Sequence, residues 1–342
     1  TARHERVMVE QRQTAMTQRR PSLAEYAQRN AALLREHFGA WREPAFFVQF
    51  GAGFVLDGLF DQPQHDLPLH RLDGMPDGLT PDLNSPELLY GCCQDLPILV
   101  ARGHRHLYEG HGVHPCVLPA VTAIALGVHR HILVDSALSL RNDIKPGSWT
   151  VLTDFINGHH LSPLDGQHDL LTTPFPDMNS ALSQLQNSEI VNALHGVGVD
   201  VRHCVFLSQP GSQFCTMAEA AMARQSGADL IGHDLVMEII MAHAMGAMVS
   251  AFALAALQLP EATPAALRRD AVLSTCQFAS PDFIRGLRLA IPEIVKVHHA
   301  SNSAPPPLPE PNADDILHED YRRIKEPRSP LRSRLIRKNQ PE

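Results

Sequence analysis

Short apolar runs alternate with segments of helical periodicity along most of the chain. Apolar runs bounded by turn residues predict buried strands at 45–50, 97–101, 131–136, 149–152, 204–208, 230–231 and 248–254. Apolar residues at helical spacing predict helices at 23–38, 119–127, 216–226, 237–245 and 262–298. Strands that alternate with helices indicate an α/β domain, in which polar residues collect at the strand ends.

Three stretches depart from this pattern. Residues 61–88 are rich in Pro, Asp and Gly and predict a long irregular connection. Residues 1–20 show no apolar period, and the Pro-rich run at 304–309 is expected to break regular structure. The length of 342 residues is compatible with two domains of ordinary size or with one larger α/β domain.

Composition narrows the class of protein. Hydrophobic residues make up 44% of the chain and charged residues 19%, which is a globular composition. No run of about 20 apolar residues predicts a membrane span. The first 20 residues lack the apolar stretch of a secretory signal, and the six cysteines form no CxxC pair. These features favour a cytoplasmic protein.

Charge is distributed unevenly. The formal net charge is −8, yet residues 322–342 hold eight basic and two acidic residues. The body is therefore acidic, which argues against nucleic acid as its partner. The basic tail is the exception, because it has the charge to touch RNA, an anionic surface or a neighbouring subunit, although a solvated extension is the simpler interpretation.

One strand end carries a specific signature, whereas the GxGxxG, P-loop, HExxH and GxSxG motifs are absent from the sequence. Residues 103–110 read G-H-R-H-L-Y-E-G. They resemble the G-R-x-H-x-Y-E-G segment of the trimeric purine nucleoside phosphorylases and methylthioadenosine phosphorylases. Further matches to that family follow in the family's order, at 50–53, 134–137, 145–148, 154–157, 162–166, 175–178, 211–219 and 227–238.

The resemblance runs from about residue 26 to about residue 257 and implies a fold and an activity. The fold is a single α/β domain at 21–300 with a mixed, barrel-like central sheet flanked by helices, assembled as a homotrimer. A loosely ordered extension at 1–20 and a Pro-rich, basic extension at 301–342 flank it. The implied activity is cleavage of the N-glycosidic bond of a nucleoside-like ligand by phosphate, with no cofactor. Such a site positions phosphate and stabilises the departing base by hydrogen bonds.

The residues that the resemblance places around phosphate are altered. Ala52 replaces a loop Ser, His104 replaces an Arg although Arg105 is adjacent, and Asp234 replaces a Ser or Thr, while His106 is kept. A carboxylate repels a phosphate dianion, and loss of the Arg removes a bidentate donor. These changes argue against phosphate as a co-substrate.

The base and sugar sites are altered as well. Cys215 replaces a Glu that holds the purine, Leu257 replaces an Asn near its N7, and His233 replaces a Met beside the sugar. Tyr108 and Phe214 remain to pack against a sugar or a ring. The expected substrate-binding residues are Ala52, His104, Arg105, Tyr108, Ser136, Phe214 and Leu257.

The replacements are themselves reactive. His104 and His106 would share a face of a strand, and His233 and Asp234 should approach them. This set fits a divalent metal site. It equally fits a His–Asp pair that activates water, with His233–Asp234 as the expected proton-transfer pair. Cys215 beside a histidine would be a nucleophile. The catalytic candidates are therefore His106, His233, Asp234 and Cys215.

Three interpretations of the whole chain stay open at this point. The first is an enzyme that cleaves a nucleoside-like ligand with an altered phosphate and base site. The second is a non-catalytic binding or structural homologue that keeps the fold, and the third is a metal-dependent hydrolase that uses the His/Asp cluster.

Overall fold

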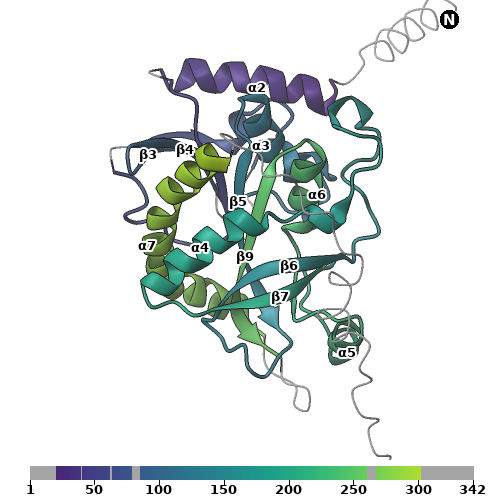
Figure 1. Cartoon of the computed structure of the whole chain (residues 1–342). Helices are drawn as coiled ribbons and strands as arrows, with labels where there is room; N and C mark the ends of the chain where they lie inside the picture. Colours follow the sequence, from purple (N-terminus) through teal and green to yellow (C-terminus); the bar gives the residue numbers. More distant parts are fainter. Residues whose placement is uncertain (1–20, 40, 62–63, 79–84, 260–266, 302–342) are drawn as a thin grey trace, which may run out of the picture. The chain divides into compact units, whose positions relative to one another are not determined.

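A mixed sheet that partly closes on itself organises the chain in the computed structural model, which describes residues 21–39, 41–61, 64–78, 85–259 and 267–301. Within these residues the sheet has nine strands in the order β2-β3-β4-β1-β5-β8-β7-β6-β9, and β9 also pairs with β5. The strands from β5 to β9 therefore form a closed, barrel-like ring, from which β1, β4, β3 and β2 extend (Figure 1). The predicted α/β fold with a barrel-like sheet is confirmed.

The strands and helices have the following bounds. The strands are β1 (Phe46–Phe50), β2 (His65–Pro68), β3 (Glu87–Cys93), β4 (Leu96–Arg102), β5 (Arg130–Ser139), β6 (Trp149–Asn157), β7 (Val201–Ser208), β8 (Leu230–Gly232) and β9 (Met248–Gln258). The α-helices are α2 (Leu23–His37), α3 (His114–Ala125), α4 (Gln184–Gly196), α5 (Met217–Gln225), α6 (Val236–Ala244) and α7 (Arg269–Ser301).

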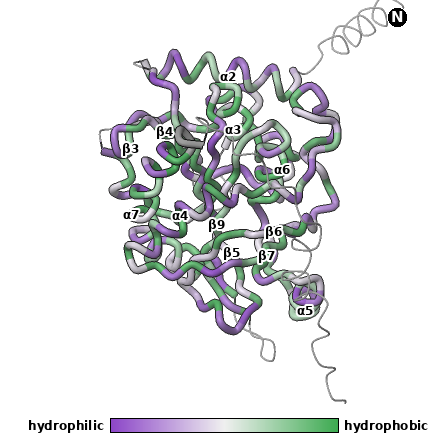
Figure 2. The backbone as a smooth tube through the Cα atoms, viewed as in Figure 1, coloured by the Kyte–Doolittle hydropathy of each residue, from purple (hydrophilic) through white to green (hydrophobic). Residues whose placement is uncertain are grey.

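Helix α2 illustrates how local sequence forms an element. Ser22 and Glu25 form a reciprocal capping box, in which each side chain accepts a hydrogen bond from the other residue's backbone N–H. Leu23, Ala27 and Leu34 recur at helical spacing and are buried. Hydrophobic and hydrophilic positions accordingly alternate along α2 (Figure 2).

Helices cover the sheet in two groups, each with its own hydrophobic cluster. Helices α2, α3 and α6 share one cluster with one set of strand side chains, and α4 and α7 share a second cluster with the other set. Trp149 stacks on Phe283 of α7 with ring centroids 4.2 Å apart, inside the second cluster. Because these two clusters pack against both faces of β1, β4 and β5, the positions of these strand ends are well fixed.

The strand directions determine where polar groups gather. β1 is parallel to both β4 and β5, so that Phe50 is level with Arg102 at the end of β4 and with Val134 within β5. β1 and β4 end there, whereas β5 continues and pairs with β9. Loop residues that follow β1 and β4 therefore lie beside the second half of β5, as expected for a site at the carboxyl ends of parallel strands.

Several sequence predictions need correction. β2 lies within 61–88, which was predicted to be irregular, and β3 begins there. Helix α4 was not predicted, and α3 begins at His114 rather than at 119. The expected extension at 1–20, the Pro-rich run and the basic tail lie outside the described residues. No helix in the described part of the chain is long and apolar enough to cross a bilayer.

Candidate functional site

A pocket opens where β1 and β4 end and β5 continues. The empty space in it is about 530 Å³ with the open mouth included. The pocket is lined by Ala52, His106, Tyr108, Asp135, Ser136, Ala137, Leu138, Phe214, Ile231, Gly232, His233, Asp234, Leu257, Arg269 and Val272. Most of the expected substrate-binding residues therefore lie around one cavity.

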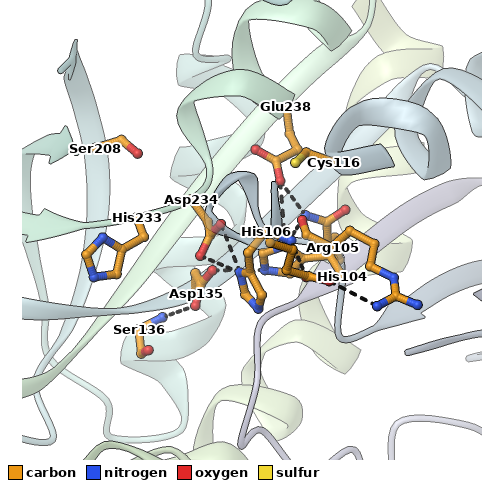
Figure 3. Close-up of polar contacts among 12 residues, drawn as sticks. His104, Arg105, His106, Cys116, Asp135, Ser136, Ser208, His233, Asp234 and Glu238 are labelled. Atoms are coloured by element: carbon orange, nitrogen blue, oxygen red, sulfur yellow. Dashed lines mark hydrogen bonds and ion pairs between the residues drawn. The ribbon is translucent and has the colours of Figure 1, made fainter. Parts of the chain in front are cut away.

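Asp234 and His106 form a tightly paired dyad at this pocket. Both Asp234 carboxylate oxygens lie 3.0 Å from His106 Nδ1, so that this ring nitrogen donates its hydrogen to the carboxylate (Figure 3). His106 also stacks on Tyr108, with ring centroids 4.7 Å apart and planes 8° apart. Asp234 thus fixes the orientation of the imidazole. With the hydrogen on Nδ1, the other ring nitrogen, Nε2, carries the lone pair of the neutral ring. Within the described residues, the hydrogen bonds of the His106 ring all involve Nδ1.

His104 is a buried cation directly behind the dyad. Its Nε2 lies 3.2 Å from Asp135 Oδ2 and its Nδ1 lies 3.2 Å from the Arg105 carbonyl oxygen, so both ring nitrogens face oxygen acceptors. Burial lowers the pKa of His104, but the charges of Asp234, Asp135 and Glu238 outweigh burial and raise this pKa to about 10. The geometry and the pKa agree that His104 is an imidazolium at neutral pH.

The carboxylates around His104 differ in their protonation. Burial raises the pKa of Asp234, but the nearby His106 and His104 hold it well below its usual range, so Asp234 is ionised. Burial and the charge of Asp234 raise the pKa of Glu238 to about 7 even though His104 opposes the shift. Gln49 supports Glu238 by donating its Nε2–H to Glu238 Oε1 at 3.1 Å.

Asp135 reaches the pocket because the neighbouring turn has a glycine. A side chain at Gly51 would overlap the Asp135 carboxylate, which therefore packs directly against the glycine backbone. Asp135 Oδ1 accepts a hydrogen bond of 2.6 Å from the Ser136 backbone N–H, while Oδ2 faces His104. The Asp135 carboxylate is thus already the hydrogen-bond acceptor of the Ser136 N–H at the pocket wall.

The backbone beside Asp234 is strained. Leu235, which follows it and precedes α6, has φ = 74°. This left-handed region is unfavourable for a γ-branched residue and is often found at functional sites. Packing compensates for the strain, because Leu235 is buried in the cluster shared with α2 and α3. The strained turn directly follows Asp234, whose carboxylate accepts from His106.

Four sequence predictions about the site differ from the structure. His104 and His106 lie beyond the end of β4 rather than on a strand, although their rings lie 4.5 Å apart. His233 does not pair with Asp234; its Nδ1 donates to the Gln209 carbonyl oxygen at 3.0 Å, and its ring points away from the dyad (Figure 3). The His–Asp pair that the structure forms is therefore His106–Asp234.

Arg105 is the third correction, since it does not line the pocket. Its guanidinium donates to Glu109 and to the Pro76 and Gly78 carbonyl oxygens at 2.6–3.0 Å. The side chain is buried and serves to fix the loop at 76–78, so it does not replace the Arg missing at His104.

The fourth prediction that differs from the structure is Cys215 as a nucleophile. Cys215 is 7% exposed, packs among Leu138, Leu207 and Ile231, and is absent from the pocket lining. Burial raises the pKa of its thiol, and the charge of Glu219 raises it further. A thiol with a raised pKa forms little thiolate at neutral pH, so Cys215 is unsuited to act as a nucleophile.

We expect Cys215→Ala to keep the wild-type rate of any reaction in this pocket. The substitution should lower the free energy of unfolding by about 1 kcal/mol, because it removes one buried atom from a packed cluster. Steady-state kinetics and urea unfolding measure the two effects. Complete loss of activity in a variant that unfolds like the wild type would contradict this assignment.

The predicted metal site is brought together only in part. His104, His106 and Asp234 each offer one ligand atom within 4.8 Å of the others, but His233 does not belong to this group. A metal needs a lone pair from each imidazole, whereas both His104 nitrogens face oxygen acceptors. The donor set as arranged does not fit a divalent ion, and metal binding stays a prediction.

Two buried carboxylates of the site were not identified from the sequence. Asp135 interrupts the apolar run of β5, and Glu238 interrupts the apolar sequence of α6. A charged residue within an apolar run is the signal that would have found them, because such a residue must be paired when buried. Arg269, the first residue of α7, was also missed as part of the lining.

Comparisons with known proteins agree with this fold. The family model described as "Phosphorylase superfamily" matches residues 93–285. Purine nucleoside phosphorylase 1 of Geobacillus stearothermophilus is 26% identical over 267 residues, which cover 78% of this chain and 96% of the relative. Purine nucleoside phosphorylase of Mycobacterium tuberculosis is 29% identical over 236 residues, which cover 68% and 83%.

Solved structures give the same result for the fold alone. A Schistosoma purine nucleoside phosphorylase in complex with hypoxanthine has a TM-score of 0.67 at 21% identity, covering 78% of this chain and 96% of the other. The Schistosoma mansoni enzyme in complex with inosine has a TM-score of 0.68 at 21% identity, covering 78% and 95%.

Proposed function

Because the chain belongs to the phosphorylase superfamily, we propose that it cleaves the N-glycosidic bond of a purine nucleoside-like ligand in the pocket described above. The observation that carries the proposal is the Asp234–His106 dyad at the wall of this pocket. An imidazole oriented by a carboxylate is a common general base, and His106 lines the space that a ligand would fill. The homotrimer implied by the sequence stays part of the proposal.

The lining supports a ligand with a polar sugar and an apolar, planar base. His106, Ser136 and His233 offer polar groups to hydroxyls, while Tyr108 and Phe214 offer flat aromatic surfaces. The remaining wall is mostly aliphatic, formed by Leu138, Ile231, Leu257 and Val272. With Leu257 in the wall and Cys215 buried behind it, base recognition rests on packing more than on hydrogen bonds.

This wall leads to a prediction about base selectivity. Incubation with inosine, adenosine, guanosine and methylthioadenosine should release free base from each. The values of kcat/KM for the first three should agree within about tenfold, because an apolar pocket discriminates poorly between bases that differ by a polar group. Chromatography of the released base measures both the reaction and the ratios.

The same assay separates the proposal from its alternatives. No base release from any nucleoside would contradict cleavage, and thermal stabilisation by purines without turnover would then favour a binding homologue. Elemental analysis of protein purified without chelator, together with activity that depends on added metal, would favour the metal-dependent hydrolase.

A further inference from the structure

We propose that water, and not phosphate, attacks the sugar in this pocket, so that the protein is a nucleoside hydrolase. This inference rests on the proposed cleavage of the N-glycosidic bond and names its second reactant. Three features of the pocket carry it: the hydrogen-bond donors that an anion would need, the positions of two carboxylates, and the orientation of His106.

A phosphate anion needs several N–H or O–H donors directed at it. Four polar hydrogens at or directly behind the pocket wall already have acceptors within this chain. His104 donates to Asp135 and to a backbone carbonyl, His106 Nδ1 donates to Asp234, and the Ser136 N–H donates to Asp135. The turn residue Ala52 offers no hydroxyl.

The two carboxylates behave as anions that the chain itself supplies. Asp135 and Asp234 both line the pocket. Asp135 accepts a hydrogen bond from His104, and Asp234 accepts one from His106. Phosphate would have to displace a carboxylate that is covalently held and buried, and would meet its negative charge at short range. Arg269 also lines the pocket, so a test must include this residue.

The dyad suits the activation of water. Asp234 holds the Nδ1–H of His106, which leaves the lone pair of Nε2 to accept a proton. A water molecule that donates to Nε2 would be positioned by a base whose ring is fixed on its face by Tyr108. Water is small enough to bind beside two carboxylates, and its hydrogens can donate to them.

The reaction balances with water as the second reactant. The water oxygen forms a bond to C1 of the sugar, and the bond between C1 and the base nitrogen breaks. The electron pair of that bond leaves with the base, and the water proton passes to His106 Nε2. The base takes up a proton from solvent, and His106 later returns its proton to solvent. The products are the free sugar and the free base.

The test follows both products with and without phosphate. Wild-type protein is incubated with inosine in phosphate-free buffer and in buffer that contains radiolabelled inorganic phosphate. We expect the same rate of base release in both buffers, free ribose as the sugar product, and no label in a sugar phosphate. Base release that requires phosphate and yields labelled sugar 1-phosphate would overturn hydrolysis while leaving glycosidic cleavage intact.

Two further outcomes have distinct meanings. No base release in either buffer would overturn both the cleavage and the choice of nucleophile. The Arg269→Ala variant should be as insensitive to phosphate as the wild type. Phosphate activation of the wild type that disappears in Arg269→Ala would locate a phosphate site at α7 and overturn the inference.

Discussion

The Asp234→Asn variant is expected to release base about 10³- to 10⁴-fold more slowly than the wild type, in kcat rather than in KM. Asp234 accepts the Nδ1–H of His106 through both carboxylate oxygens. An amide in its place can donate to Nδ1, which moves the imidazole hydrogen to Nε2 and removes the lone pair that accepts the proton of water. Single-turnover measurements of base release give the rate of the chemical step.

Companion variants distinguish loss of the base from loss of the fold. His106→Ala should be impaired to a similar extent, and the double variant should be little worse than either single one, because the two residues act as a unit. Asp200→Asn is a matched control, since Asp200 is exposed and pairs with Arg202 at the surface. Additive losses in the double variant would contradict the dyad.

The second large effect concerns stability. Replacing His104 by Ala is expected to lower the free energy of unfolding by about 3–5 kcal/mol at pH 6.5, because it leaves buried carboxylates without their cation. Those carboxylates belong to Asp135, Asp234 and Glu238, which all act on the charge of His104. Urea unfolding gives this value. His203→Ala, on an exposed position of β7, should change it by less than about 0.5 kcal/mol.

The deficit of the His104→Ala variant should depend on pH in a defined direction. Folding raises the pKa of His104 from 6.5 to about 10, so the folded protein keeps a proton that the unfolded chain releases above pH 6.5. The stability that His104 contributes is complete below pH 6.5 and is lost as the pH rises through about 10. The difference between wild type and variant should therefore shrink between these values. An equal deficit at both ends would contradict a charged His104.

Much of the fold could be predicted from the sequence, for physical reasons. β1, β4 and β5 are continuous apolar runs because both faces of the sheet are covered, and such runs are easily recognised. Helix α4 escaped prediction because its buried residues are only Gln186, Ile190 and Leu194, which is too few for a clear period. β2 also escaped, because it is only four residues long and Leu67 is its one buried residue.

The site was predictable as a group of residues but not as a set of pairs. The sequence correctly suggested that His104, His106 and Asp234 approach one another. It paired Asp234 with its chain neighbour His233, whereas in the folded chain His233 donates to the Gln209 carbonyl oxygen and Asp234 accepts from His106. The roles of Asp135 and Glu238 depend on contacts between distant segments, which only the folded chain reveals.

Under the proposed hydrolysis, the carboxylate that Asp135 places on the Ser136 amide bears on the direction in which the reaction can run. Transfer of a sugar to phosphate keeps an activated ester at C1, so the products can recombine and the net direction follows the concentrations of base and sugar phosphate. Transfer to water yields a sugar with no activated group, and the solvent cannot be depleted. If water is the attacking group, as proposed, a pocket whose backbone donor is filled by its own side chain is suited to one-way breakdown of nucleosides and not to their synthesis.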